Sequence, residues 1–526
     1  MRVVPRTAKH AVLLAGSGLV GLLGSGTIAE ANQPFLFPGS LVVSTSTYAN
    51  NQGAVKTLTA GQTQLAGAAS APPYSSPPTC ATATAGNDYV NVWNNDTPDG
   101  SFGVTSEITL TDISPSNGQV LATLNVPTNQ VVTSFSSKSE LGLHFVVGPS
   151  GPMLTFGGYG GAGVGALDVS NSDVVAGQDP TNPVTYCFGG AQSTYAFPRT
   201  VVSVTKNGSL VYTPTIDFGG NNGRSALFSP ETGLYYEVGN ANNGSANTYG
   251  YHCPGTKTAT NCTDPDVTET TGLEAINPLN WSSWNFGTIP PNNSAEVDPT
   301  YASISGDKAG KDSNYRGVTE FNGALYFTKG SGSNGIDTVY TVSPGLPTLA
   351  GAPSATVSVV PGFPTSPAKT AADYTPFAVF FANSTTMYVA DEGSGDATDV
   401  SSHAGLEKWS LVNGTWQLDY VLTNNLIGTQ YTLSGYDGAY PTVTTAGLRN
   451  LTGVVNGGTV TLWATTSTSS TSGDNGADPN EVVVIQDQLS ATTLPNESFS
   501  VLGAPTYGSV YRGVAYINDP MTGNGG

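Results

Sequence analysis

The chain has 526 residues, of which 10% are charged, and its formal net charge at pH 7 is −20. This acidic balance disfavours nucleic acid and anionic membrane surfaces as partners. Hydrophobic residues make up 38% of the chain and 24 residues are tyrosine, so the chain can bury a large core, and intrinsic disorder is excluded as its main state.

Residues 1–31 have the features of a secretory signal peptide. A basic start with Arg2, Arg6 and Lys9 precedes an apolar, glycine-rich stretch, and small residues at Ala29 and Ala31 follow it. No later segment has the ~18 apolar residues that a membrane span needs. We therefore expect an exported protein that is secreted, with the periplasm and the cell surface as the other destinations.

From residue 40 onward the chain repeats a unit of four strands, A to D. The clearest copy has its strands at 316–321, 324–329, 337–342 and 355–361, and Asn322-Gly323 joins the first two, as expected for a tight hairpin. No helical period of useful length interrupts the repeats. Further copies begin near Leu141, Arg224, Pro376 and Gly447.

The two ends of the chain complement each other. Strands B, C and D at 40–48, 106–114 and 119–127 have no A strand before them, whereas 511–517 is an A strand with nothing after it. Pairing them would close a ring and leave no exposed sheet edge. The sequence therefore predicts an all-β fold, a β-propeller of six four-stranded blades over 32–518, followed by a flexible tail, 519–526. Seven blades stay open, because 240–310 is long enough to hold further strands.

Long insertions separate the B and C strands at 48–104, 159–198 and 240–310. They carry all four cysteines, and in an exported chain an even number of cysteines predicts disulfides. Cys253 and Cys262 flank one short loop and are expected to pair, which leaves Cys80 with Cys187. In a propeller the B–C loops lie on one face, and we predict that this face carries the function.

Only five arginines follow residue 31, and four of them open A strands: Arg224, Arg316, Arg449 and Arg512. Tyr315 and Tyr511 precede two of them, and Tyr374 takes the corresponding place in a repeat without arginine. Guanidinium groups around a channel mouth suit a carboxylate, sulfate or phosphate. The alternative is structural, because an arginine at this corner of a blade can bind carbonyl groups and acidic side chains of the next blade.

Other candidates for chemistry are scattered along the chain. His144, on an A strand, could act as a general base, Glu140 takes nearly the place of an arginine, and Tyr315 or Tyr511 could move a proton. Calcium is the cofactor that the acidic loop with Asp391, Asp396 and Asp399 would suit, although its spacing matches no known calcium loop. A solvated acidic loop is the alternative.

The stretches YRGVTEFNGALYFTKGSGSNG, MYVADEG, GLEKWSLVNGTW and YRGVAYI resemble blades of secreted microbial β-propeller proteins. The similarity is best over 314–518 and weaker over 35–240. It implies the fold and export and assigns no catalytic residue.

Two functions are compatible with these features. The first is a monomeric binding protein that recognises an extracellular glycan or protein through the loop-rich face and its Arg/Tyr rim. The alternative is an extracellular lyase or glycoside hydrolase that acts on an acidic glycan, in which arginines neutralise a carboxylate while a tyrosine or histidine removes the adjacent proton. The sequence alone does not choose between binding and catalysis.

Overall fold

The computed structural model describes residues 34–47, 105–134, 142–161, 163–164, 197–219, 221–240, 271–279, 281, 292–299, 314–330, 336–366, 374–395, 403–435, 438–439, 441–471, 476 and 478–518. It also describes the backbone of four short strands, β2 (Gln64–Ala66), β3 (Cys80–Thr82), β4 (Asn94–Asp96) and β5 (Asp99–Gly103). The predicted signal peptide, 1–31, and tail, 519–526, lie outside these residues.

The fold is all-β, as predicted. In the described part of the chain the helical structure is a single 3-10 turn, η5 (Ala352–Ser354). No described helix has the length and apolar character needed to span a membrane.

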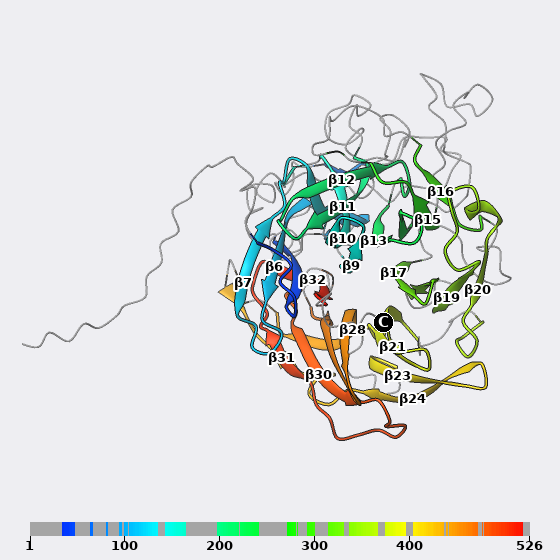
Figure 1. Ribbon diagram of the computed structural model, residues 1–526. Coiled ribbons are helices and arrows are strands. Elements are labelled where there is room, and N and C mark those ends of the chain that lie inside the picture. Colours follow the sequence, from blue (N-terminus) through cyan, green and yellow to red (C-terminus); the bar gives the residue numbers. More distant parts are fainter. Residues whose placement is uncertain are drawn as a thin grey trace, which may run out of the picture.

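Four small antiparallel sheets are arranged around an axis as blades of a β-propeller, each with its strands in chain order from the axis outward (Figure 1). They are β13 (Gly223–Ser229), β14 (Leu234–Gly239), β15 (Gly272–Ile276) and β16 (Ser294–Glu296); β17 (Tyr315–Phe321), β18 (Ala324–Lys329), β19 (Thr338–Ser343) and β20 (Thr356–Val359); β21 (Pro376–Asn383), β22 (Thr386–Asp391), β23 (Gly405–Val412) and β24 (Thr415–Leu422); and β28 (Val443–Asn456), β29 (Thr459–Ser469), β30 (Val482–Gln488) and β31 (Ser500–Gly503). The short β25 (Gln430–Tyr431) pairs with β28, and β26 (Ser434–Gly435) pairs with β27 (Gly438–Ala439).

The rest of the ring is one nine-stranded sheet that contains two four-strand runs. One run is β32 (Ser509–Tyr516), β1 (Leu41–Thr47), β6 (Thr105–Ile113) and β7 (Val120–Asn125); the other is β9 (His144–Gly148), β10 (Gly151–Gly160), β11 (Arg199–Thr205) and β12 (Leu210–Thr215). A short strand, β8 (Val131–Ser134), pairs with both β6 and β10 and joins the runs. The predicted pairing of the last strand with the first is present, with Val43 opposite Val514.

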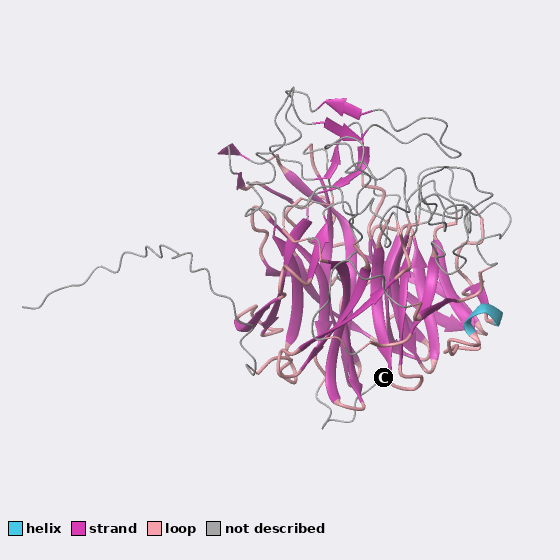
Figure 2. Ribbon diagram, turned by 90° about the horizontal axis from the view of Figure 1, so that it is seen from above, coloured by secondary structure: helices cyan, strands magenta, loops and turns pink. Residues whose placement is uncertain are grey.

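The innermost strands all run in the same sense between the two ends of the ring, which Figure 2 shows from the side. We call the end at which they start the arginine end, and the end at which tight turns join them to their second strands the turn end. Asn322 and Gly323 form one such turn with φ angles of 49° and 69°. These left-handed angles are those that an Asn-Gly hairpin turn requires, as predicted.

The hydrophobic core lies between neighbouring sheets. One cluster joins Tyr236 and Leu273 to Phe327 and Tyr340 of the next sheet, and others fill the corresponding spaces around the ring. Burying each large apolar side chain contributes roughly 1.5–3 kcal/mol. Packing between sheets, more than pairing within them, therefore holds the inner strands around the axis.

The predicted insertion at 240–310 needs a correction. Strands β15 and β16 lie inside this range, so the segment between the second and third strands of that sheet is shorter than predicted. The fourth strand has three residues and no alternating pattern, and its shortness explains why the sequence does not reveal it.

Candidate functional site

The four repeated arginines occupy β-bulges on the innermost strands. The pairing register of β13, β17, β28 and β32 with the next strand shifts at Arg224, Arg316, Arg449 and Arg512. In β21 the matching shift lies between Pro376 and Ala378, so Phe377 takes the place of the arginine there. A bulge turns one side chain out of the alternation along a strand, which accounts for a repeated special residue at this point.

These arginines are buried, and Arg316, Arg449 and Arg512 contact other groups of the protein. Arg316 Nη2 lies 3.1 Å from Glu392 Oε1, and Arg449 Nε lies 3.4 Å from Glu392 Oε2. Arg316 Nε also donates to Gly330 O, at 2.9 Å, and Arg512 Nε donates to Ser46 Oγ at the same distance. Burial lowers the pKa of Arg316, and the charge of Glu392 opposes that shift. Glu392 therefore links the inner strands of the two sheets on either side of its own.

The side chains of all four arginines are at most 5% exposed. These contacts favour the structural role for the arginine end, because a buried charge that loses its partner destabilises a fold strongly. Anion binding there stays a prediction.

The predicted tyrosines lie near the same end and are also engaged. Tyr374 donates through its hydroxyl to Glu407 Oε2 at 2.9 Å, and Glu407 Oε1 lies 3.0 Å from His403 Nδ1. Burial and the charge of Glu407 raise the pKa of Tyr374 well above its usual value. Tyr315 is fully buried, and Tyr511 donates to Ala504 O at 3.1 Å. Burial also raises the pKa of Tyr511, so Tyr374 and Tyr511 stay protonated at pH 7.

The predicted metal and disulfide residues fall largely outside the described chain. Asp391 accepts hydrogen bonds from the backbone N–H groups of Thr375 and Gly393, and burial raises its pKa to about 7. Within the described ranges no three His, Cys, Asp or Glu side chains gather as ligands of a metal ion would.

Cys80 begins β3, but its side chain is not described. The remaining predicted residues, Glu140, Asp396, Asp399, Cys187, Cys253 and Cys262, lie outside the described residues.

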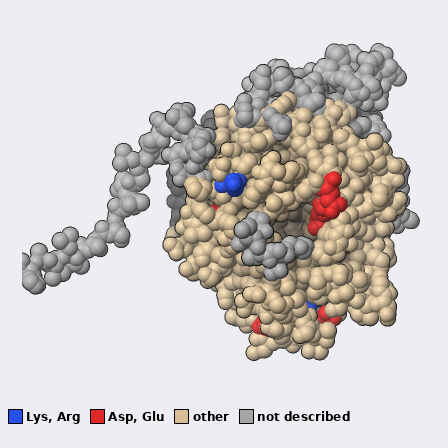
Figure 3. All heavy atoms as spheres, viewed as in Figure 1, with Lys and Arg blue, Asp and Glu red and all other residues tan. Residues whose placement is uncertain are grey.

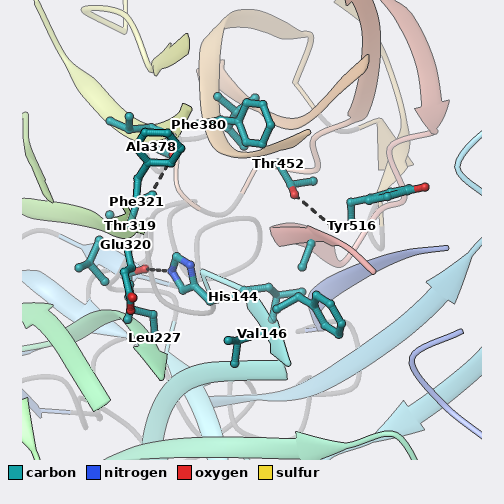
Figure 4. A pocket seen from close by; sticks show the side chains of 18 of the residues that line it. His144, Val146, Leu227, Thr319, Glu320, Phe321, Ala378, Phe380, Thr452 and Tyr516 are labelled. Carbon is teal, nitrogen blue, oxygen red and sulfur yellow. Dashed lines mark hydrogen bonds between the residues drawn. The ribbon is translucent and has the colours of Figure 1, made fainter. Parts of the chain in front are cut away.

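His144 lies in the central channel. Its Nε2 is 2.7 Å from Ser225 Oγ of the neighbouring sheet (Figure 4). Enclosure in the channel lowers the pKa of His144 to about 4, because the charged form loses hydration. The imidazole is therefore neutral at pH 7 and exchanges a hydrogen bond with the serine.

A cavity of about 390 Å³ occupies the channel on the turn-end side of the arginines. Its walls are the inner strands β9, β13, β17, β21, β28 and β32, and it reaches the turn at Asn322 and Gly323. Figure 4 shows His144, Thr319, Phe380 and Thr452 around it. A concave site of this size that combines aromatic with hydroxyl and amide side chains is typical of a small-ligand site.

The alternation of a strand explains which side chains line this cavity. Residues three positions after the five bulges line the channel, namely Leu227, Thr319, Phe380, Thr452 and Ala515, and His144 of β9 lines it with them. Residues one position after the bulge form the floor, where the strands come close. A Cβ on Gly317 would lie 2.6 Å from Phe377 O, so only glycine fits there. Because residues such as Gly317 are small, the strands approach one another at the floor, and the channel is narrow between the cavity and the arginine end.

The cavity is acidic. Two of its described lining residues, Glu231 and Glu320, carry carboxylates, and none of them is Lys or Arg. Burial and the charge of Glu231 raise the pKa of Glu320. The face at the turn end shows acidic atoms beside its central hollow and is mostly uncharged elsewhere (Figure 3).

The cavity residues, apart from His144, were missed by the sequence analysis. Glu320, Phe380 and Asn450 stand at positions whose residue type changes from repeat to repeat, whereas the arginine position recurs. The signal that could have found them is the set of variable positions that follow the arginine on each A strand.

No protein-family model matches the chain, and no curated protein matches it. Among solved structures, the chain is similar to the hemagglutinin-neuraminidase of parainfluenza virus 5 with the ligand DANA. The two are 11% identical, the match covers 90% of this chain and 97% of that chain, and the TM-score is 0.31. A likeness this distant transfers no ligand or residue role, so the description of the fold rests on the strand pairing itself.

Proposed function

We propose that the protein is a glycan-binding β-propeller whose ligand enters the central cavity from the turn end. The single observation that carries this proposal is the lining of the cavity. Phe145, Phe321 and Phe380 supply aromatic side chains to the lining, while Thr319 and Thr452 supply hydroxyl groups among them. Sugar rings present apolar C–H faces and many hydroxyl groups. The aromatic side chains suit the C–H faces, and the threonine hydroxyl groups suit the sugar hydroxyl groups.

We further infer that six blades close the ring and that the chain is exported. The count is supported by the four separate sheets and by the two four-strand runs of the nine-stranded sheet. Export is supported by residues 1–31. Both inferences fit an extracellular binding role at a glycan surface.

A second candidate function is glycoside hydrolysis in the same cavity. It is favoured by Glu320 and Glu231, because a carboxyl group with a raised pKa beside a second carboxyl group is the arrangement from which hydrolases build a general acid. An acidic substrate has less support, because the described cavity lining offers no cation to a uronate.

Titration calorimetry with neutral, amino and uronate oligosaccharides tests the binding proposal. We expect at least one sugar class to bind the full chain, and Phe380→Ala to weaken that binding about tenfold. Leu494→Ala is the control, since Leu494 is 61% exposed and lies outside the cavity. Binding that Phe380→Ala leaves intact would place the ligand elsewhere.

Chromatography of the same mixtures separates binding from hydrolysis. Saturated fragments that disappear in Glu320→Gln would establish the hydrolase, whereas intact sugars after long incubation leave the binding protein.

A further inference from the structure

The charged groups of the central cavity are carboxylates, which accept hydrogen bonds only, whereas its hydroxyl, amide and imidazole groups can both donate and accept. At the mouth stand the carboxylates of Glu231 and Glu320, and Glu231 lies close to the turn, since its Oε2 would be 3.7 Å from a Cβ on Gly323. No lysine or arginine is among the described residues that line the space. A ligand with donors and positive charge is therefore favoured at the mouth.

A second acceptor lies at the floor. The side chain of Asn450 is 7% exposed and lines the cavity, and its Nδ2 donates to Arg512 O at 2.7 Å. Among the described residues nothing donates to its Oδ1. This oxygen is not closed off from solvent, so it is accessible to a donor on a ligand in the cavity.

Gly142 keeps that oxygen open. A Cβ on Gly142 would lie 3.1 Å from Asn450 Oδ1 and 2.9 Å from Ser225 Oγ. Both contacts are tighter than side chains normally make, so any larger residue would fill the space in front of the oxygen.

The mouth and the floor are separated along the strands. Glu320 lies four positions after its bulge and Asn450 one position after its own, a difference of three residues, or roughly 10 Å at the rise of a strand. Phe380, three positions after its bulge, stands between these levels, whereas Phe321, five positions after its own, lies on the mouth side of Glu320 and stacks on Phe381 at 4.4 Å. Aromatic faces attract both sugar C–H groups and ammonium groups.

From this arrangement we propose that the cavity selects amino sugars, glycans with free ammonium groups, over neutral and acidic glycans. The proposal rests on the proposed function and names its ligand class. A lysine side chain carries its donors only at its tip, whereas a glucosamine chain carries ammonium and hydroxyl donors along its length. The two levels of acceptors therefore favour the sugar over a basic peptide.

The test is calorimetric titration of the full chain with three tetrasaccharides, those of glucosamine, N-acetylglucosamine and galacturonic acid. We expect the glucosamine tetramer to bind at least tenfold more tightly than the N-acetyl form, and the uronate not to bind. Glu320→Gln and Glu231→Gln should each remove most of this preference while the N-acetyl form binds as before. Glu107→Gln, which makes the same charge change on β6 outside the cavity, is the matched control.

Proton release gives an independent readout. The pKa of Glu320 is raised above its usual value, and an ammonium group stabilises its ionised form, so binding should release protons at a pH close to the folded pKa of Glu320. The release is seen as a heat that depends on the ionisation enthalpy of the buffer. This dependence should disappear in Glu320→Gln and persist in Glu107→Gln.

The outcomes separate the two proposals. If the N-acetyl or uronate tetramer binds as tightly as glucosamine, the ligand class is overturned while glycan binding stands. If no sugar binds, the proposed function itself fails. If a short lysine peptide binds as tightly as glucosamine and Glu320→Gln abolishes both, the cavity is a site for cationic peptides and the glycan assignment is overturned.

Discussion

The two ends of the central channel are built from the same inner strands but handle charge in opposite ways. At the arginine end, Arg316 and Arg449 share Glu392, and all three side chains are buried within the protein. At the turn end, Glu320 and Glu231 face a cavity that has no cation among its described lining residues. The charges at the arginine end are paired within the protein, whereas the carboxylates at the turn end line a cavity with space for a ligand.

This difference teaches how a repeat separates structure from recognition. The bulge position recurs, and at Arg316 and Arg449 it holds neighbouring sheets together through Glu392. The positions further along the strand vary from His144 to Phe380, and variation around a shared space is how a repeated frame builds a single site.

The largest expected effect is the loss of stability when a buried ion pair at the arginine end is removed. Arg316→Ala leaves Glu392 with one partner in a buried site and should lower the free energy of unfolding by about 3–5 kcal/mol. Ligand affinity below the transition should not change. Denaturant unfolding together with calorimetry measures both, with the exposed Lys206→Ala as control. A variant as stable as the parent that has lost its ligand would reverse the roles of the two ends.

A smaller effect tests the floor of the cavity. Gly142→Ala places a methyl group against Asn450 Oδ1 and Ser225 Oγ, so we expect about tenfold weaker ligand binding and a loss of stability of about 1–3 kcal/mol. Gly458→Ala is the matched control, because no atom lies within 4 Å of its added Cβ. Equal affinity in the two variants would show that the ligand does not reach the floor.

The smallest single effect is expected at Glu320, and the same substitution at Glu392 provides the comparison between the two ends. Glu320→Gln should raise stability slightly at pH 8, by less than about 1 kcal/mol, because it removes a carboxylate that burial and Glu231 disfavour. Glu392→Gln should lower stability by several kcal/mol, since it leaves two buried arginines without their carboxylate.

The pH dependence of stability tests the direction in which folding shifts the pKa of Glu320. Its folded pKa lies above its unfolded value of about 4.5, so folding takes up a proton between the two and wild-type stability falls as the pH rises through this window. The Gln variant lacks this contribution, so the two proteins should be equally stable near pH 3.5 and diverge above it. Denaturation midpoints across pH 3.5–8 measure this, and a constant difference would contradict the assignment.

Much of the fold could be predicted from the sequence, because hairpin turns and strand alternation are local. Asn322-Gly323 predicts its turn without knowledge of the rest of the chain, and the lone strand at 511–517 predicts its pairing with β1. The third strand of the sheet at 240–310 follows from its apolar pattern, but β16 has no such pattern. The number of strands per sheet was therefore harder to predict there.

The candidate site was less predictable, for a physical reason. The sequence shows that the arginines share a position in the repeat. It does not show that Arg316 and Arg449 both contact Glu392, because these contacts form only when three sheets come together. The same holds for the cavity, since Ser225 and Asn450 are far apart in sequence and become neighbours only around the axis. Local sequence patterns identify the repeated positions, whereas the contacts that form the site join residues of different strands.

The pairing of β32 with β1 also sets the order in which the protein can fold. Thr47 and Ser509 lie side by side although 462 residues separate them. A contact of such long range forms late and slowly, because the intervening chain must be ordered before its ends meet. Until then β1 presents an unpaired edge that could join another chain. During biogenesis, β1 therefore depends on β32, which is synthesised much later, for protection against aggregation.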